Sequence, residues 1–345
     1  MASEEFLIIF DNPTRCYYPG QNVSGHILIS TPTEIKAKGL QIQFYGRAAT
    51  HWSETRYETH SIQTEHGYET RTVSYTEHFR SNENYFCYEM HHLRDGSDQA
   101  HSITGRNMYP FNFLLPPGGI PCSYAGAHGE IEYGIMATIR TPWYNFNKEV
   151  EARINVLVIV DLNLFPPRLV MPVERTASKH YCCLCCASGP VGLTVRLPKT
   201  GFAQGEVVPL IVDMFNDSGR PINGITVCIT EESRFHAEGN RRTSTRSLSQ
   251  FEGPGVDPHG TDTWNPVFRI PQLAPTGLGG CRLIDLEYYL HFELLLSGIS
   301  YNLEMSIPIV IGSIPIQIPP PNQAGFNSYS STNTNYQPHI PTNVS

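Results

Sequence analysis

The densest group of potentially reactive side chains in this sequence is a cysteine cluster. Cys182, Cys183, Cys185 and Cys186 lie close together, and His180 precedes them. Thiolates and imidazoles bind zinc, but a structural zinc site usually takes its ligands from two pairs that are a dozen or more residues apart. The sequence has no second pair, so we expect no metal ion and no cofactor. Zinc binding and S-acylation are the alternatives to an unmodified connecting segment, which the sequence favours.

A second candidate site is a serine that follows a basic pair. Arg241 and Arg242 stand shortly before Ser244, a spacing that resembles a basophilic kinase substrate. Phosphate on Ser244 would add negative charge beside Arg246 and order the surrounding segment. We expect residues 231–262 to form a long polar loop, in which the basic residues serve only solubility under the simpler interpretation.

Basic side chains of the first half are the candidates for binding a partner. Lys36, Lys38 and Arg47 supply much of the positive charge there. Lys36 and Lys38 alternate with Ala37, so both can face solvent from one side of an extended segment. A solvated rim is the simpler interpretation of all three.

Motifs of known enzymes are missing from the sequence. We find no Gly-x-Ser-x-Gly elbow, no phosphate-binding loop of the Walker type, no Gly-x-Gly-x-x-Gly and no His-Glu-x-x-His. Scattered serine, histidine and aspartate residues do not define a catalytic site by themselves. We therefore expect no enzymatic activity and no catalytic residue.

Composition excludes further classes of function. The 345 residues carry a net charge of −8, whereas a protein that binds nucleic acid usually has a basic surface. The polar start of the chain does not resemble a signal peptide, and no apolar run reaches the roughly 18 residues of a membrane span. Nine cysteines without a secretory signal favour reduced thiols. We expect a cytoplasmic protein without a nucleic-acid partner.

The strand pattern occurs twice. Residues 16–45 align without a gap on residues 201–230, so that Gly20 falls on Gly205 and Gly39 on Gly224. Both copies alternate apolar and polar residues with a period of two, which predicts strands with one face toward a core. Repetition at a fixed shift indicates a duplicated unit.

A second pair of segments repeats at a smaller shift. Residues 113–116 fall on 268–271, and the strand pattern after Ile131 falls on that after Leu286. The first copy therefore holds extra residues, which we place in exposed hairpins within the polar region 49–102. The sequence predicts an all-β protein with two antiparallel immunoglobulin-like sandwiches. Their predicted bounds are residues 1–163 and 188–312, with a Pro- and Cys-rich linker at 164–187 and a disordered tail at 313–345.

Several segments, taken in order, resemble the arrestin-domain family, and most closely its α-arrestin branch. The similarity extends over nearly the whole chain from Phe6 to Ile311, and the duplication strengthens it. The segments that carry it are residues 6–13, 18–25, 113–116, 188–190, 201–206, 216–218 and 270–271.

The resemblance implies two sandwiches joined by a short hinge, with concave faces that bind membrane proteins. α-Arrestins act as adaptors: they hold the cytoplasmic segment of a receptor or transporter and link it to a HECT-type ubiquitin ligase, endocytosis and protein transport. Such a role implies recruitment to the plasma membrane and endosomes, with peripheral membrane contact.

Two family features are missing from this sequence. The ligase is usually recruited through Pro-Pro-x-Tyr, but Pro319, Pro320 and Pro321 are followed by Asn322. The first strand, near Phe6, also lacks the lysine pair that senses receptor phosphates. Ligase recruitment would therefore be indirect. The alternatives are a retromer-like trafficking scaffold without a ligase role and a thiol- or metal-binding regulatory protein that uses residues 182–186.

Overall fold

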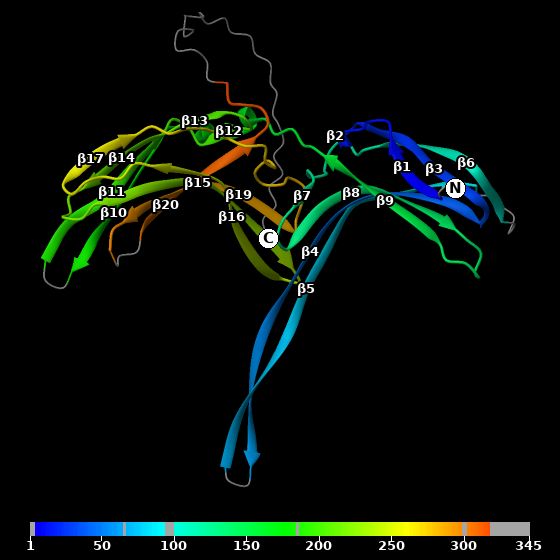
Figure 1. Cartoon of the computed structure of the whole chain (residues 1–345), viewed down its shortest axis with the longest axis horizontal. Helices are drawn as coiled ribbons and strands as arrows, with labels where there is room; N and C mark the ends of the chain where they lie inside the picture. Colours follow the sequence, from blue (N-terminus) through cyan, green and yellow to red (C-terminus); the bar gives the residue numbers. More distant parts are fainter. Residues whose placement is uncertain (1–3, 65–66, 94–99, 184–185, 299–301, 318–345) are drawn as a thin grey trace, which may run out of the picture.

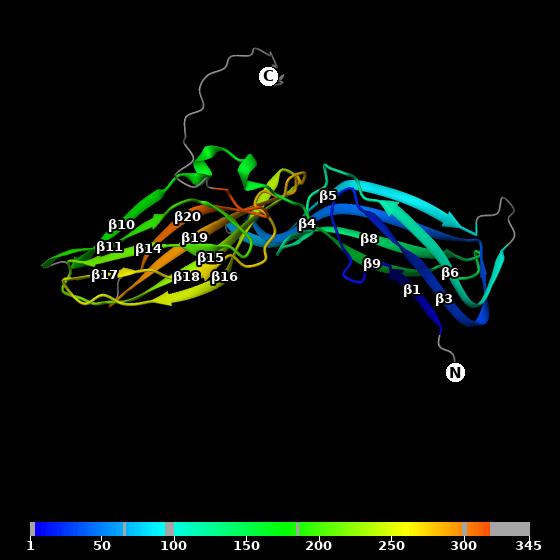
Figure 2. The same ribbon diagram turned by 90° about the horizontal axis from the view of Figure 1, so that it is seen from above.

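The structure of the chain is a computed structural model that describes residues 4–64, 67–93, 100–183, 186–298 and 302–317. It forms an arch of two β-sandwiches on either side of a narrow waist, and a long hairpin leaves the arch on one side (Figure 1). Figure 2 shows the same two bodies from above. The predicted all-β architecture of two tandem sandwiches is confirmed.

The N-terminal sandwich consists of a three-stranded and a six-stranded sheet. The smaller sheet has the order β1-β3-β6, and the larger has the order β2-β9-β8-β4-β5, with β7 paired to β8. All pairs are antiparallel except β2 with β9. The strands are β1 (Glu5–Phe10), β2 (Cys16–Tyr17), β3 (Asn22–Ala37), β4 (Gly39–Thr64), β5 (Gly67–His92), β6 (His101–Leu114), β7 (Tyr124–Ala125), β8 (Gly129–Arg140) and β9 (Lys148–Val156).

Two short 3-10 helices follow the first sandwich. They are η1 (Leu162–Leu164) and η2 (Pro167–Val170), and their residues Leu162 and Leu169 are buried. The end of the described chain returns to this waist, because the Ser313 and Ile314 amides donate to the Val160 carbonyl at 2.8 and 3.1 Å. The helices in the described part of the chain are all too short to span a membrane.

The C-terminal sandwich repeats the plan with a four-stranded and a five-stranded sheet. The orders are β10-β11-β14-β17 and β12-β20-β19-β15-β16, and β13 pairs with β18 beside them. The strands are β10 (Val173–Cys183), β11 (Cys186–Leu197), β12 (Gly201–Ala203), β13 (Val207–Pro209), β14 (Ile211–Asn216), β15 (Ile222–Ala237), β16 (Asn240–Gly253), β17 (Gly260–Trp264), β18 (Val267–Arg269), β19 (Ile284–Leu296) and β20 (Leu303–Gly312).

The repeated apolar positions form the two cores. Leu40 and Ile42 on β4 are fully buried, as are Val227 and Ile229 at the matching positions of β15. Alternation along a strand sends every second side chain inward, so these residues line the space between the two sheets of each sandwich. Their outward neighbours lie on the concave side of the arch.

The region between the sandwiches differs from the sequence-based division of the chain. Val173–Cys183 was placed in the connecting segment, whereas the structure pairs this strand with β11 over most of its length. Prolines at 166, 167 and 172 suggested a stiff connector, but the chain after Pro172 alternates freely enough to add an edge strand.

Candidate binding surface

The hairpin of β4 and β5 is the feature that distinguishes the concave side. β4 pairs with β8 only from Gly39 to Thr50, and beyond that point β5 is its only partner. Trp52 and Phe79 stack at this root with ring centroids 5.4 Å apart, and each is only 3% exposed. Past Trp52 the ribbon extends for about 40 Å to Thr64, at the usual rise of a strand. It projects clear of both sandwiches (Figure 1).

The two faces of this projecting hairpin differ in chemistry. Residues directly opposite each other in an antiparallel ladder share a face. One face is charged: Arg56 pairs with Glu77 at 2.5 Å, and Glu58 lies opposite Val73. The other face carries hydroxyl groups and no carboxylate among its described side chains. Its members are Thr55 opposite Thr76, Tyr57 opposite Ser74, and Thr59 opposite Thr72.

Both edges of the hairpin are open as well. No described strand pairs with β4 beyond Thr50, or with the outer side of β5. An isolated two-stranded ribbon is only marginally stable in water, and open edges offer unpaired amides and carbonyls to another chain. The hairpin is thus a surface that gains stability when a partner covers it.

The root of the hairpin is bonded to the C-terminal sandwich. The Thr50 hydroxyl donates to the His236 carbonyl at 2.7 Å, and Arg242 lies 3.3 Å from Glu54. On β5, Glu83 accepts from Arg282 at 2.7 Å. These contacts tie the hairpin to the joint between the two domains.

A buried carboxylate lies at the centre of this joint. Glu231 on β15 is 2% exposed and is held by Arg246 on β16 at 2.8 and 3.0 Å. From the N-terminal domain, the Tyr124 hydroxyl donates to Glu231 at 3.0 Å and lies 2.5 Å from the Ser233 hydroxyl. Tyr288 adds a fourth contact at 3.3 Å. One anion therefore collects donors from both domains.

The ionisation of this cluster follows from its burial. Loss of water raises the pKa of Tyr124 to about 12 and also raises the pKa of Tyr288. The hydrogen bonds from Glu231 raise the pKa of Arg246 above its ordinary value. The cluster thus contains neutral phenols and a charged pair at neutral pH, and buried charge is tolerated because each group has its partner.

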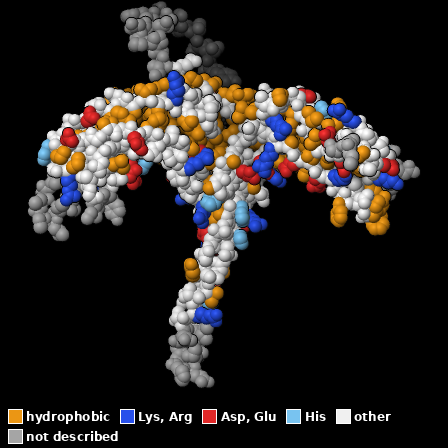
Figure 3. Space-filling model, in the orientation of Figure 1, with side chains coloured by type: hydrophobic (Ala, Val, Ile, Leu, Met, Phe, Trp, Pro, Cys, Tyr) orange, Lys and Arg blue, Asp and Glu red, His pale blue; other side chains and the backbone are white. Residues whose placement is uncertain are grey.

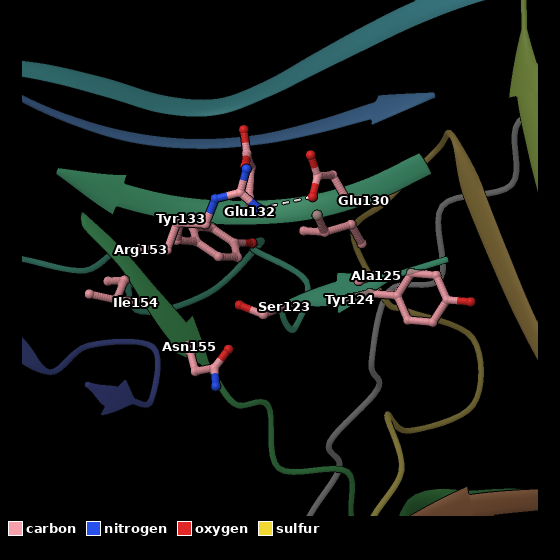
Figure 4. A pocket seen from close by; sticks show the side chains of 10 residues that line it. Ser123, Tyr124, Ala125, Glu130, Glu132, Tyr133, Arg153, Ile154 and Asn155 are labelled. Atoms are coloured by element: carbon pink, nitrogen blue, oxygen red, sulfur yellow. Dashed lines mark hydrogen bonds and ion pairs between the residues drawn. The ribbon is translucent and has the colours of Figure 1, made fainter. Parts of the chain in front are cut away.

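A small pocket lies beside β7, β8 and β9 in the N-terminal domain (Figure 4). Its volume is about 200 Å³, below the roughly 300 Å³ at which small-molecule sites begin. Arg153 spans it and lies 3.0 Å from Glu130 and 2.5 Å from Glu132. Because its cation is already neutralised, the pocket does not offer an anion site.

Arg47, a candidate for partner binding in the sequence, lies on the other side of the same carboxylate. Its guanidinium is 2.5 Å from Glu132, which is 6% exposed. Burial alone would lower the pKa of Arg47, but the hydrogen bond and charge of Glu132 raise it overall. Arg47 thus holds a buried charge, and its place at mid-β4 is remote from Lys36 and Lys38 at the end of β3.

The cysteine cluster lies at the end of a hairpin of the C-terminal domain. Cys182 pairs with Ala187 and Cys183 with Cys186 in the ladder of β10 and β11, while Cys185 lies outside the described residues. No metal-binding group of three or more suitable side chains occurs in the part of the chain that the structure describes. Zinc binding and acylation at these cysteines stay untested predictions.

Ser244 lies in a strand and not in a loop. It is opposite Ser233 in the ladder of β15 and β16, so the prediction of a long polar loop over residues 231–262 was wrong. Polar residues on the outer strand of a sheet gave a loop-like composition, which hid the hairpin. Phosphorylation of Ser244 is still a prediction, now at a half-buried strand position.

Sequence reasoning did not identify Tyr124, Glu231 or Arg246. Each is an ordinary polar residue within a strand pattern, and only the packing of the two domains brings them together. One signal was available: Glu231 continues the inward positions of Val227 and Ile229 beyond an irregularity in the ladder. A carboxylate at a core position requires a buried partner.

Two tandem sandwiches that meet at a polar joint, with a hairpin projecting from their concave side, define an arrestin-type protein. The arrestin (or S-antigen) N-terminal domain family matches residues 6–163, and the corresponding C-terminal domain family matches residues 187–316. The chain belongs to the arrestin family.

Among its relatives are arrestin domain-containing proteins, which agrees with the α-arrestin branch. Arrestin domain-containing protein 4 of Homo sapiens is 27% identical over 330 residues, which cover 94% of this chain and 73% of the relative. Arrestin domain-containing protein 17 of Caenorhabditis elegans is 26% identical, with 90% and 71% covered. Thioredoxin-interacting protein of Mus musculus is 24% identical, with 90% and 74% covered.

Proposed function

We propose that this protein is a cytoplasmic, non-enzymatic adaptor that holds the cytoplasmic segment of a transmembrane receptor or transporter and passes it to endocytic sorting. The observation that carries the proposal is the β4–β5 hairpin, whose faces and edges are exposed past its Trp52 root. An element that buries so little of itself contributes little to the stability of the fold. Its role is to contact something else.

Two features of the hairpin suit an extended segment of a membrane protein. The open edge of β5 can pair with an added strand through main-chain hydrogen bonds, which require no particular sequence. The row of hydroxyl groups around Tyr57 can then bind polar side chains of that strand. Neither feature selects one cargo, which is appropriate for an adaptor that serves several.

The link to sorting machinery is indirect in this proposal. The sequence has no Pro-Pro-x-Tyr motif, so a HECT-type ligase would be recruited through another protein. Cargo binding would bring the adaptor to the plasma membrane and endosomes. Ubiquitylation of the cargo would then depend on the presence of this protein without direct contact between it and the ligase.

The test removes the projecting part of the hairpin and leaves its root. Residues 55–76 are replaced by Asn-Gly, which closes a tight turn between Glu54 and Glu77 because these two residues are already opposite each other. Proximity labelling in cells then compares the membrane proteins found beside the full chain and beside the shortened one. We expect the shortened protein to lose most transmembrane proteins from its labelled set.

A charge exchange provides the matched control. Arg56→Glu combined with Glu77→Arg keeps the length, the ion pair and the hydroxyl face of the hairpin, so it should retain the labelled set. The thermal unfolding of the shortened protein should match that of the full chain. If the shortened protein folds normally and labels the same membrane proteins as before, the proposed role of the hairpin is wrong.

A further inference from the structure

The turn between β8 and β9 exposes aromatic side chains to an unusual degree. Trp143 is 92% exposed, Phe146 96% and Tyr144 58%, all within residues 141–147. Trp143 and Tyr144 are in edge-to-face contact with ring centroids 5.8 Å apart. Aromatic side chains of this size are normally covered in a folded domain.

The backbone of this turn is well ordered by its own hydrogen bonds. The Asn145 amide donates to the Pro142 carbonyl at 2.9 Å, and the Thr141 hydroxyl donates to the Asn145 carbonyl at 2.9 Å. The Thr141 amide also donates to the Asn147 side chain at 3.0 Å. The rings are therefore presented by a built turn.

Cations surround the turn. It contains no charged residue, and it begins directly after Arg140, whose carbonyl accepts from the Lys38 amide at 2.6 Å. Lys36 is two positions earlier on the same strand. Among the described residues, no carboxylate lies within ion-pair distance of Lys36, Lys38 or Arg140; Arg140 bonds the neutral Gln41 at 2.7 Å. At the far end of the turn, Lys148 pairs with Glu4.

The turn is at the outer end of the N-terminal domain and leaves the arch on the same side as the β4–β5 hairpin (Figure 1). In Figure 3, hydrophobic side chains protrude at the lower right end of the molecule, where Figure 1 places this turn. The protrusion is convex, so it has the shape of an element that enters another phase and not that of a pocket.

We propose that residues 141–147, together with Lys36, Lys38 and Arg140, form a membrane anchor that binds the interface of an anionic lipid bilayer. Trp and Tyr prefer the headgroup region, where the ring is buried and the polar tip stays hydrated. Unpaired cations next to them are attracted by the negative surface of the leaflet. The anchor assigns a joint role to the lysines that the sequence singled out.

The size of the patch favours a membrane over a protein partner. Three aromatic side chains can cover at most roughly 600 Å² of this chain's surface. Stable protein interfaces bury roughly 800 Å² on each partner and contain a concave, complementary surface. A bilayer needs neither a matching shape nor a large area, because insertion of two or three rings combines with the charge of the surface.

The test measures binding of the full chain to vesicles of phosphatidylcholine with phosphatidylserine, in the absence of any membrane protein. Trp143→Ala combined with Phe146→Ala should lower the partition coefficient about 100-fold, from the loss of two buried rings. Lys36→Gln combined with Lys38→Gln should lower it about tenfold, and only when phosphatidylserine is present. Salt should weaken binding of the unchanged protein.

Val267→Ala is the matched control, because Val267 is an apolar side chain that is 79% exposed on the other domain. It should leave vesicle binding unchanged, and all variants should unfold at the temperature of the unchanged protein. The proposal is overturned if the full chain does not bind these vesicles or if the aromatic variant binds them equally well. It is also overturned if the aromatic variant loses a protein partner in detergent while its vesicle binding is intact.

Hairpin shortening gives an independent outcome. The protein that lacks residues 55–76 should bind lipid vesicles as the full chain does, because it keeps the whole anchor. Failure of the adaptor proposal and failure of the anchor proposal are thus separate results.

Discussion

The hairpins β4–β5 and β15–β16 occupy matching places in the two halves of the chain but have opposite fates. Each begins with the same buried apolar alternation, at Leu40 in one half and at Ile225 in the other. β4 and β5 then run for 26 residues each, whereas β15 has 16 and β16 has 14. The longer hairpin passes beyond the sandwich into solvent, and the shorter one ends inside the joint between the domains.

The end of the shorter hairpin is buried by the N-terminal domain. Phe235 on β15 is fully buried and meets the His128 ring edge to face at 5.5 Å. Gly126 allows this close approach, since a Cβ at that position would lie 2.7 Å from the Phe235 ring. The comparison shows that one duplicated hairpin joins the domains while the other, freed from that task, became the exposed one.

The largest expected effect comes from removing the ring that joins the domains. Phe235→Ala leaves a cavity between the two sandwiches and should lower the free energy of unfolding by about 3–5 kcal/mol. Denaturant unfolding measures this loss, and small-angle scattering should show a wider distance distribution as the joint loosens. Tyr57→Ala on the other hairpin should change stability by less than about 0.5 kcal/mol. Equal losses for both variants would remove the distinction between the hairpins.

The ion pairs of the two hairpins provide a second, smaller contrast. Arg246→Ala leaves the buried Glu231 carboxylate without its cation, which should cost about 2–3 kcal/mol of stability. Arg56→Ala breaks the pair with Glu77, whose side chains are both at least 40% exposed, and should cost less than about 0.5 kcal/mol. Thermal unfolding in low salt compares the two variants. A loss for Arg56→Ala as large as that for Arg246→Ala would contradict the assignment of the β4–β5 hairpin as structurally dispensable.

The smallest expected effect is a dependence on alkaline pH. Burial raises the pKa of Tyr124 to about 12 in the folded protein, against about 10 for an exposed tyrosine. The stability from the neutral phenol is therefore complete below pH 10 and is lost as the pH rises toward 12. Tyr124→Phe should flatten the decline of stability over this window by about 1–2 kcal/mol. Chemical unfolding at pH 9 and pH 11 measures the difference, and parallel curves for the two proteins would exclude a role for Tyr124.

The sequence predicted the strands and their duplication because alternation of apolar residues directly reports which side of a strand faces the core. It also placed the surplus residues of the first half in exposed hairpins. It did not show that a single ribbon would hold them, because Thr, Glu and Arg on a solvated ribbon give the composition of a loop. Ser244 was misassigned to a loop for the same reason.

The polar joint and the aromatic turn were less accessible to sequence analysis for different physical reasons. Tyr124 and Glu231 become partners only through the packing of two domains, which no local pattern encodes. Trp143 and Phe146 are large apolar residues, so the ordinary expectation is burial in a core. Only the structure shows that their turn projects away from every other element.

The strands of the long hairpin continue without a break from the open ribbon into the core sheet, since β4 is one strand from Gly39 to Thr64. Such a strand is a mechanical lever with its fulcrum at Trp52 and Phe79. A small sideways pull on the far end by a bound partner is converted into torque at the root, where Thr50 and Glu54 are bonded to the other domain. Tension in the cargo is thereby transmitted to the angle between the sandwiches.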